Sequence, residues 1–195
     1  MNHTVIRPRP GLGLALLLAT ALLAGSPIGA AAGEPALQID HDQATDAMRV
    51  RATIDIAAPP AIVWAVLADC DRAPKIIPNM ESCRVVQRDP AGKWELRETV
   101  LAVMLLPRIR SVVRNEMEPG RRLVFKRVGG DMRISDGELR IEPLAKGKAT
   151  RVHYEALFAT SMIVPQFLID QAAARDFPTF FRNIERESLA DAAKK

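Results

Sequence analysis

The sequence is poor in the side chains from which most enzymes build their active sites. Its 195 residues include three histidines, two cysteines and one tyrosine, and aromatic residues make up only 5% of the chain. The G-x-S-x-G elbow, the H-E-x-x-H motif, paired C-x-x-C motifs and the G-x-x-x-x-G-K-[ST] phosphate loop are all missing. We therefore expect no catalytic residues, no metal site and no cofactor.

A strong excess of either charge is also missing from the part of the chain that should fold. Two of the 27 basic residues, Arg7 and Arg9, precede an apolar run at 12–24, and without them 25 basic residues face 23 acidic ones. The resulting net charge of about +2 does not indicate binding to nucleic acid. We expect no nucleic-acid partner.

The first 32 residues have the layout of a secretory signal peptide. The two arginines, the apolar run and a string of small residues ending at Gly33 follow one another in the usual order. The apolar run is shorter than the ~20 residues of a membrane-spanning helix. The pattern predicts a cleaved signal at 1–32 and a secreted, periplasmic protein, with an uncleaved membrane anchor as the alternative.

The two cysteines, Cys70 and Cys83, both lie in the mature chain. In an oxidising compartment they could form a disulfide, which would add ~3 kcal/mol of stability in the chain-entropy model. Neither has a neighbouring histidine, so they cannot form a structural zinc site. Two unpaired thiols are the alternative that the sequence leaves open.

What the chain does contain is a long amphipathic stretch at 166–188. Pro165 precedes it, where a missing N–H costs nothing, and Pro178 lies inside it, where the ring should bend the helix. Its apolar residues recur at spacings of three and four: Ile169, Ala173, Phe177, Phe180 or Phe181, and Ile184. We predict a helix with an aromatic inner face, which either closes an ordinary core or covers a bulky apolar ligand.

Ahead of this helix the chain has the pattern of an α+β protein. Residues 33–47 are predicted to be a flexible leader, and residues 48–56 alternate between apolar and polar as in a strand. Two short helices, beginning near Pro60 and Asp71, should follow. Turn-like breaks then separate six further strands, at 82–88, 93–104, 108–117, 121–128, 132–141 and 149–159.

The predicted order is therefore one strand, two helices, six strands and one long helix, in a single domain at 48–190. Consecutive strands with short links should pair antiparallel, which gives a seven-stranded sheet. A sheet of that size curls under its own twist, and one helix on its concave side cannot fill the trough. Either large side chains or a ligand must occupy the remaining space.

Three stretches match a known pattern: VRATIDIAAPPAIVWAVLADCDRAPKIIPNMESCRVV, GDMRISDGELRIEPL followed by ATRVHYEALF, and VPQFLIDQAAARDFPTFFRNIERE. Together they cover most of residues 50–187. They resemble the START-like, or polyketide cyclase-like, helix-grip superfamily (SRPBCC), and within it the branch of coenzyme Q-binding proteins and polyketide cyclases/dehydrases. The resemblance implies a hydrophobic tunnel between the sheet and the last helix that binds a lipid, isoprenoid, sterol or polyketide.

Two side chains in the predicted strands could meet a ligand's polar group. Tyr154 shares the apolar face of its strand, and it is either a hydrogen-bond donor to the ligand or a core residue, whereas His153 points the opposite way. Glu98 points inward if the apolar residues of its strand do. The residues expected to line the tunnel are Trp64, Glu98, Met104, Leu139, Tyr154, Phe158, Met162, Phe177 and Phe181.

Two loops are apolar where loops are normally polar. One begins at Val103 and ends at Pro107, and the other runs from Met162 to Pro165. In a helix-grip arrangement both would lie near the tunnel mouth, where they could make transient contact with a membrane surface. The alternative is that the first run is simply the end of a buried strand and that the second packs on the core.

The sequence thus favours an exported carrier or sensor of a hydrophobic small molecule, which acts by binding rather than by bond chemistry. An aromatase/cyclase-like enzyme that uses Glu98 and Tyr154 in the same tunnel is the main alternative. A protein-interaction module with a completely filled core is the third.

Overall fold

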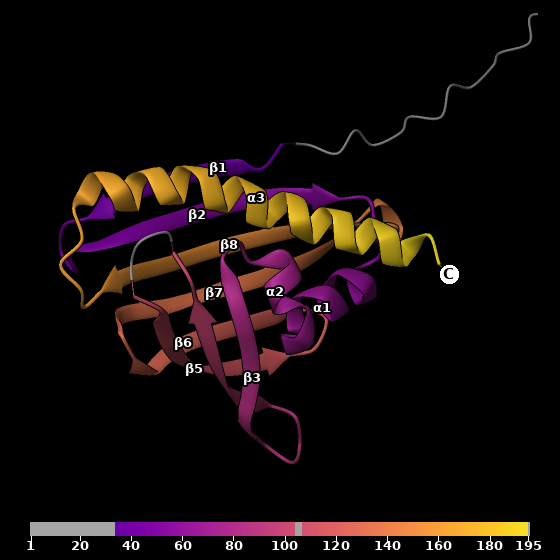
Figure 1. Cartoon of the computed structure of the whole chain (residues 1–195). Coiled ribbons are helices and arrows are strands. Elements are labelled where there is room, and N and C mark those ends of the chain that lie inside the picture. The colour runs from indigo at the N-terminus through magenta and orange to yellow at the C-terminus, as the bar shows by residue number, and fades with distance from the viewer. Residues whose placement is uncertain (1–33, 104–106, 195) are drawn as a thin grey trace, which may run out of the picture.

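The computed structural model describes residues 34–103 and 107–194. Figure 1 shows one strongly curled sheet with helices on its concave side. The sheet has eight antiparallel strands in the order β1-β2-β8-β7-β6-β5-β4-β3. The strands are β1 (Ala36–Asp42), β2 (Ala47–Ile56), β3 (Met80–Arg88), β4 (Trp94–Leu101), β5 (Ile109–Glu118), β6 (Arg122–Gly130), β7 (Met132–Leu144) and β8 (Ala149–Thr160).

The helices are few and unequal in length. α1 (Pro60–Ala68), the 3₁₀ turn η1 (Cys70–Arg72) and α2 (Ala73–Ile76) follow β2, and a second 3₁₀ turn, η2 (Ala145–Gly147), links β7 to β8. The long helix α3 (Gln166–Ala192) runs past β1 and β2, with α1 and α2 beside its C-terminal half (Figure 1). The predicted α+β helix-grip fold is confirmed. No helix in the described part of the chain is long and apolar enough to cross a membrane.

The predicted number of strands was wrong by one, because part of the expected flexible leader is the edge strand β1. Its residues Leu37 and Ile39 lie opposite Ala52 and Val50 of β2 and pack against the core. Apart from Ala36, these are the only two apolar residues of the strand, and its remaining residues are polar. So short an alternation does not stand out in the sequence.

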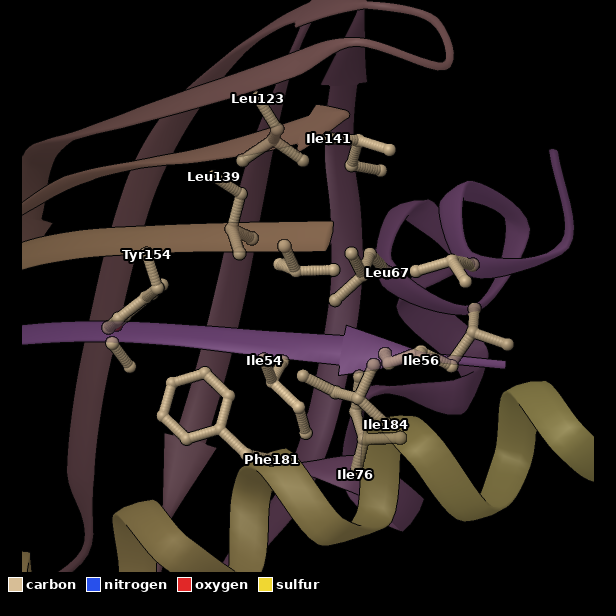
Figure 2. Packing of buried hydrophobic residues seen from close by; sticks show 14 of the residues in the cluster. Ile54, Ile56, Leu67, Ile76, Leu123, Leu139, Ile141, Tyr154, Phe181 and Ile184 are labelled. Atoms are coloured by element: carbon tan, nitrogen blue, oxygen red, sulfur yellow. The ribbon is translucent and has the colours of Figure 1, made fainter. Parts of the chain in front are cut away.

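The core lies between the concave face of the sheet, α1 and the C-terminal half of α3. Figure 2 shows Phe181 and Ile184 projecting from α3 toward Ile54 on β2, with Leu67 of α1 nearby. Phe181 and Ile184 are both fully buried. Each such side chain contributes roughly 1.5–3 kcal/mol by its removal from water.

Polar contacts also fix the C-terminal half of α3. Arg72 of η1 forms an ion pair with Asp191, and the Asn183 amide donates a hydrogen bond to the carbonyl oxygen of Ile76 at 3.1 Å. The N-terminal half is packed less tightly, and Phe167 in its first turn is 67% exposed. Pro178 lies inside the helix as predicted.

Candidate functional site

Six aromatic rings form one connected group between the concave face of the sheet and the middle of α3. Tyr154 is at its centre, with its ring centroid 5.7 Å from that of Phe181, 5.9 Å from Phe180 and 6.4 Å from Phe177. These separations are typical of favourable aromatic pairs. We call the group the aromatic cluster; it consists of Phe125, Tyr154, Phe158, Phe177, Phe180 and Phe181.

The rings of the aromatic cluster are buried to different degrees. Phe181 is fully buried and Tyr154 is 7% exposed, and both belong to the hydrophobic core. The other four rings are only partly buried and pack against that core. The cluster therefore presents partly uncovered apolar surface to the space between the concave face and the N-terminal half of α3. We call this space the concave space.

Small residues on the sheet make room for the rings. Phe125 of β6, Gly137 of β7 and Ala156 of β8 lie side by side in the register of the three strands. A Cβ atom at Gly137 would lie 2.6 Å from the Cζ atom of Phe125 and 2.7 Å from the Cβ atom of Ala156. The Phe125 ring can therefore pack over the backbone of β7 only because residue 137 has no side chain.

Tyr154 is the one aromatic residue of the cluster with a polar group. Burial raises the pKa of its phenol well above the usual value, because the charged form would lose its hydration. At neutral pH the hydroxyl therefore stays protonated and can donate a hydrogen bond. His153, its neighbour in β8, lies on the opposite face, near Thr53 and Glu142.

The wall formed by β4 and β5 on the concave side is polar. Glu95 is 1% exposed and Arg97 is 7% exposed, and they form a buried ion pair. Arg88 also donates to Glu95, with its Nη2 atom 2.8 Å from Oε2, and Arg97 donates to the carbonyl oxygen of Ala68 at the end of α1. The pair thus joins β3, β4 and α1.

Glu98 does not face the concave space, so its predicted position was wrong. Because Glu95 and Arg97 point inward, alternation along β4 turns Glu98 to the convex face. There it accepts hydrogen bonds from Arg84, at 2.8 Å, and Arg110, at 2.6 Å, which lower the pKa of its carboxyl group. A catalytic pair of Glu98 and Tyr154 is therefore impossible.

The structure brings four of the predicted lining residues together in the aromatic cluster: Tyr154, Phe158, Phe177 and Phe181. Leu139 is buried on β7, directly opposite Tyr154.

The other predicted lining residues lie elsewhere. Trp64 packs against the core from α1 and makes none of the ring contacts among the described residues. Met162 is half-buried in the link between β8 and α3. Met104 falls outside the described residues.

The prediction missed two rings of the cluster and the polar wall. Phe125 alternates with Val124 and Lys126, so the strand pattern could have placed it on the face of Leu123. Phe180 was considered only as an alternative to Phe181, but a helix face is wide enough for both. The inward positions of Glu95 and Arg97 had no signal, because the apolar residues Trp94 and Leu96 beside them favour the opposite assignment of the two faces.

Cys70 and Cys83 form a disulfide, with their Cα atoms 5.4 Å apart. The bond joins η1 to the edge strand β3. No free cysteine is present between residues 34 and 103 or between 107 and 194.

The convex face of the sheet has two open clefts, which differ in character from the concave space. One has a volume of about 970 Å³ and lies over β2, β8, β7 and β6. The other has a volume of about 570 Å³ and lies beside Trp94, whose ring is covered by Arg114 at 4.3 Å from the ring centroid. The charged side chains in the larger cleft largely pair with one another, as in the ion pair of Arg122 with Glu138.

Solved structures with the same fold include lipid-transfer proteins and an aromatase/cyclase. The lipid transfer domain of human StarD13 is 16% identical, with 82% of this chain and 85% of that chain covered and a TM-score of 0.61. A STAR-related lipid transfer protein from Xanthomonas axonopodis is 14% identical, with 80% and 94% covered and a TM-score of 0.66. The Zhui aromatase/cyclase from a Streptomyces species is 21% identical, with 74% and 88% covered and a TM-score of 0.51.

At these identities the likeness to solved structures establishes only the fold. The family model described as "Polyketide cyclase / dehydrase and lipid transport" matches residues 56–185, which include α1, the polar wall and most of α3. The match covers well over half of the chain. The chain therefore belongs to the polyketide cyclase/dehydrase and lipid transport family.

Proposed function

We propose that this protein is an exported carrier or sensor that binds a hydrophobic small molecule in the concave space. The observation behind this proposal is the incomplete burial of four of the six rings in the aromatic cluster. Four partly buried rings around a core-anchored tyrosine offer an apolar surface that water covers poorly. A lipid, isoprenoid, sterol or polyketide would cover that surface and replace the water.

Binding without bond chemistry fits the groups that face this space. A general base must have its pKa near the working pH, and the phenol of Tyr154 is protonated far above it. An aromatase/cyclase-like activity in the same space is the alternative, and it would have to use Tyr154 as a hydrogen-bond donor to a developing enolate. A Tyr154→Phe variant with unchanged turnover would argue against that alternative.

Export is part of the proposal and has two supports. The first 32 residues have the sequence pattern of a signal peptide. The disulfide between Cys70 and Cys83 belongs to an oxidising compartment, since cytosolic thiols are kept reduced. In a bacterium that compartment would be the periplasm.

A carrier of lipids also needs to meet a membrane, and the link between β8 and α3 is the candidate contact. Ile163 is fully exposed and Phe167 is 67% exposed, although large apolar side chains normally avoid water. We expect these two residues to insert transiently into the membrane interface. The predicted partner loop, from Val103 to Pro107, lies largely outside the described residues.

Native mass spectrometry tests the proposed function most directly. The full chain would be expressed in a bacterial host and purified from the periplasmic fraction without detergent, and bound molecules would be extracted with organic solvent. We expect a protein that begins at Gly33 and carries an apolar ligand. A Phe177→Trp variant, which crowds the aromatic cluster at a half-buried position, should lose the ligand while remaining folded.

The matched control is Phe167→Trp, the same substitution on the same helix but at an exposed position. It should retain the ligand. A ligand-free protein that takes up nothing from a lipid extract would contradict the proposal and favour a filled core.

A further inference from the structure

One hydroxyl group on the concave side of the sheet is buried and has no partner. Ser111 of β5 is 5% exposed, and its Oγ atom makes no hydrogen bond among the described residues. A buried hydroxyl without a partner is uncommon, because its desolvation is not compensated. Thr99 lies directly opposite Ser111 on β4, so two hydroxyl-bearing side chains are neighbours across the two strands.

The register of the strands places this pair on the concave face. Cys83, the neighbour of Thr99 on β3, is bonded to Cys70 of η1, and η1 lies on the concave side. Ser111 and Asn115 are an even number of residues apart on β5, so their side chains lie on the same face of the sheet. Asn115 lies directly opposite Phe125 of the aromatic cluster. Ser111 and Asn115 are four positions apart along the strand, a distance of about 13 Å at the usual rise.

The charged groups around this position are already engaged. Arg97 is committed to Glu95 and to the carbonyl oxygen of Ala68. Arg108 pairs with Glu81, at 2.6 Å between Nε and Oε2, and Arg110 pairs with Glu98 on the convex side. A carboxylate or phosphate at Ser111 would therefore find no free cation among these arginines, whereas a neutral oxygen needs only a hydroxyl group.

We propose that Ser111, together with Thr99, binds a neutral oxygen, a hydroxyl or a carbonyl, at the end of an elongated ligand whose apolar body lies on the aromatic cluster. The distance along β5 between Ser111 and Asn115 indicates the length of that ligand. Its oxygen lies about 13 Å from the row of Asn115 and Phe125. The inference rests on the proposed function and narrows its ligand class to uncharged, oxygen-bearing molecules.

A matched set of fluorescent probes tests the assignment. 1-Pyrenebutanol and 1-butylpyrene share one apolar body and differ by one hydroxyl group, and 1-pyrenebutyric acid adds a charge. The ratio of the dissociation constants of 1-pyrenebutanol and 1-butylpyrene measures the contribution of the hydroxyl group to binding. In Ser111→Ala we expect this ratio to shift by about five-fold against the alcohol, the value of one neutral hydrogen bond. Thr99→Val should shift it in the same direction.

Ser188→Ala is the matched control. Ser188 is also fully buried, and its hydroxyl has no hydrogen-bond partner in the described part of the chain, but it lies on α3 beyond Ile184 and away from β5. The ratio of the two dissociation constants in Ser188→Ala should equal the ratio in the wild type. An unchanged ratio in Ser111→Ala, an equal shift in Ser188→Ala, or tighter binding of the acid than of the alcohol would overturn the inference. If neither neutral probe binds the wild type, the proposed function itself fails, which is a different outcome.

Discussion

Gly137 is the residue on which the shape of the aromatic cluster depends most. Besides its contact with Phe125, a Cβ atom there would lie 2.6 Å from the backbone oxygen of Glu155, which cannot move without disturbing β8. We expect Gly137→Ala to destabilise the protein by about 1–3 kcal/mol, as overpacking usually does, and to weaken ligand binding because Phe125 must move.

Gly129→Ala is the control for this change, and urea denaturation measures both variants. Gly129 also lies in a strand, but its Cβ atom would meet Val112 at an ordinary 3.7 Å. Its stability should change by less than about 1 kcal/mol. Equal effects of the two substitutions would mean that Gly137 is not needed to accommodate Phe125.

Glu95 and Glu98 lie on one strand but face opposite sides of the sheet, and their substitutions should differ accordingly. Glu95→Gln removes the charge that compensates a buried Arg97 and should lower the free energy of unfolding by about 3 kcal/mol. Glu98→Gln removes a partner of two exposed arginines and should cost less than about 1 kcal/mol. The comparison requires only urea titrations at neutral pH, and a larger effect at Glu98 would contradict the register of β4.

The same strand shows why sequence reasoning at the scale of single residues is limited. Alternation predicts the face of a residue only if apolar side chains point inward, which is true for Val50 and Ile54 on β2. On β4 the inward positions hold an ion pair whose partners, Arg88 and the carbonyl oxygen of Ala68, come from other elements. Those partners become visible only in the folded structure.

Among the elements, η1 and β3 depend most on a covalent link. The disulfide between Cys70 and Cys83 closes a separation of 13 residues, for which chain entropy alone gives a stabilisation of about 3 kcal/mol. Dithiothreitol should therefore lower the urea midpoint of the wild type. The double variant Cys70→Ser/Cys83→Ser should begin at the lower midpoint and show no response to the reductant; a response would implicate another effect of dithiothreitol.

Most elements were predictable because their local pattern and their tertiary role agree. The long helix and the meander from β3 to β8 have clear periodicity and turn residues, and their antiparallel pairing follows from the short links. β1 was missed because it is stabilised mainly by pairing with β2. A tertiary partner, rather than its own sequence, defines this strand.

At the scale of the whole molecule, the exposed residues at the N-terminal end of α3 should decide whether the protein meets membranes. Ile163→Ser/Phe167→Ser should strongly reduce flotation with vesicles of phosphatidylcholine and phosphatidylglycerol, because these are the two most exposed large apolar side chains in the described part of the chain. Leu189→Ser, a partly exposed apolar residue at the other end of α3, is the control and should not change flotation. Equal flotation of all variants would exclude this contact.

The ends of the sheet have a consequence for the protein in concentrated solution. Because β1 and β3 are the outermost strands, each has a row of backbone groups that another chain could extend into a larger sheet. In β3 the pairing with β4 is irregular at two places, between Met80 and Ser82 and between Val85 and Gln87, so that edge is not a straight template. Edge-to-edge polymerisation through β3 is thereby disfavoured, and the free protein can accumulate without forming fibrils through this strand.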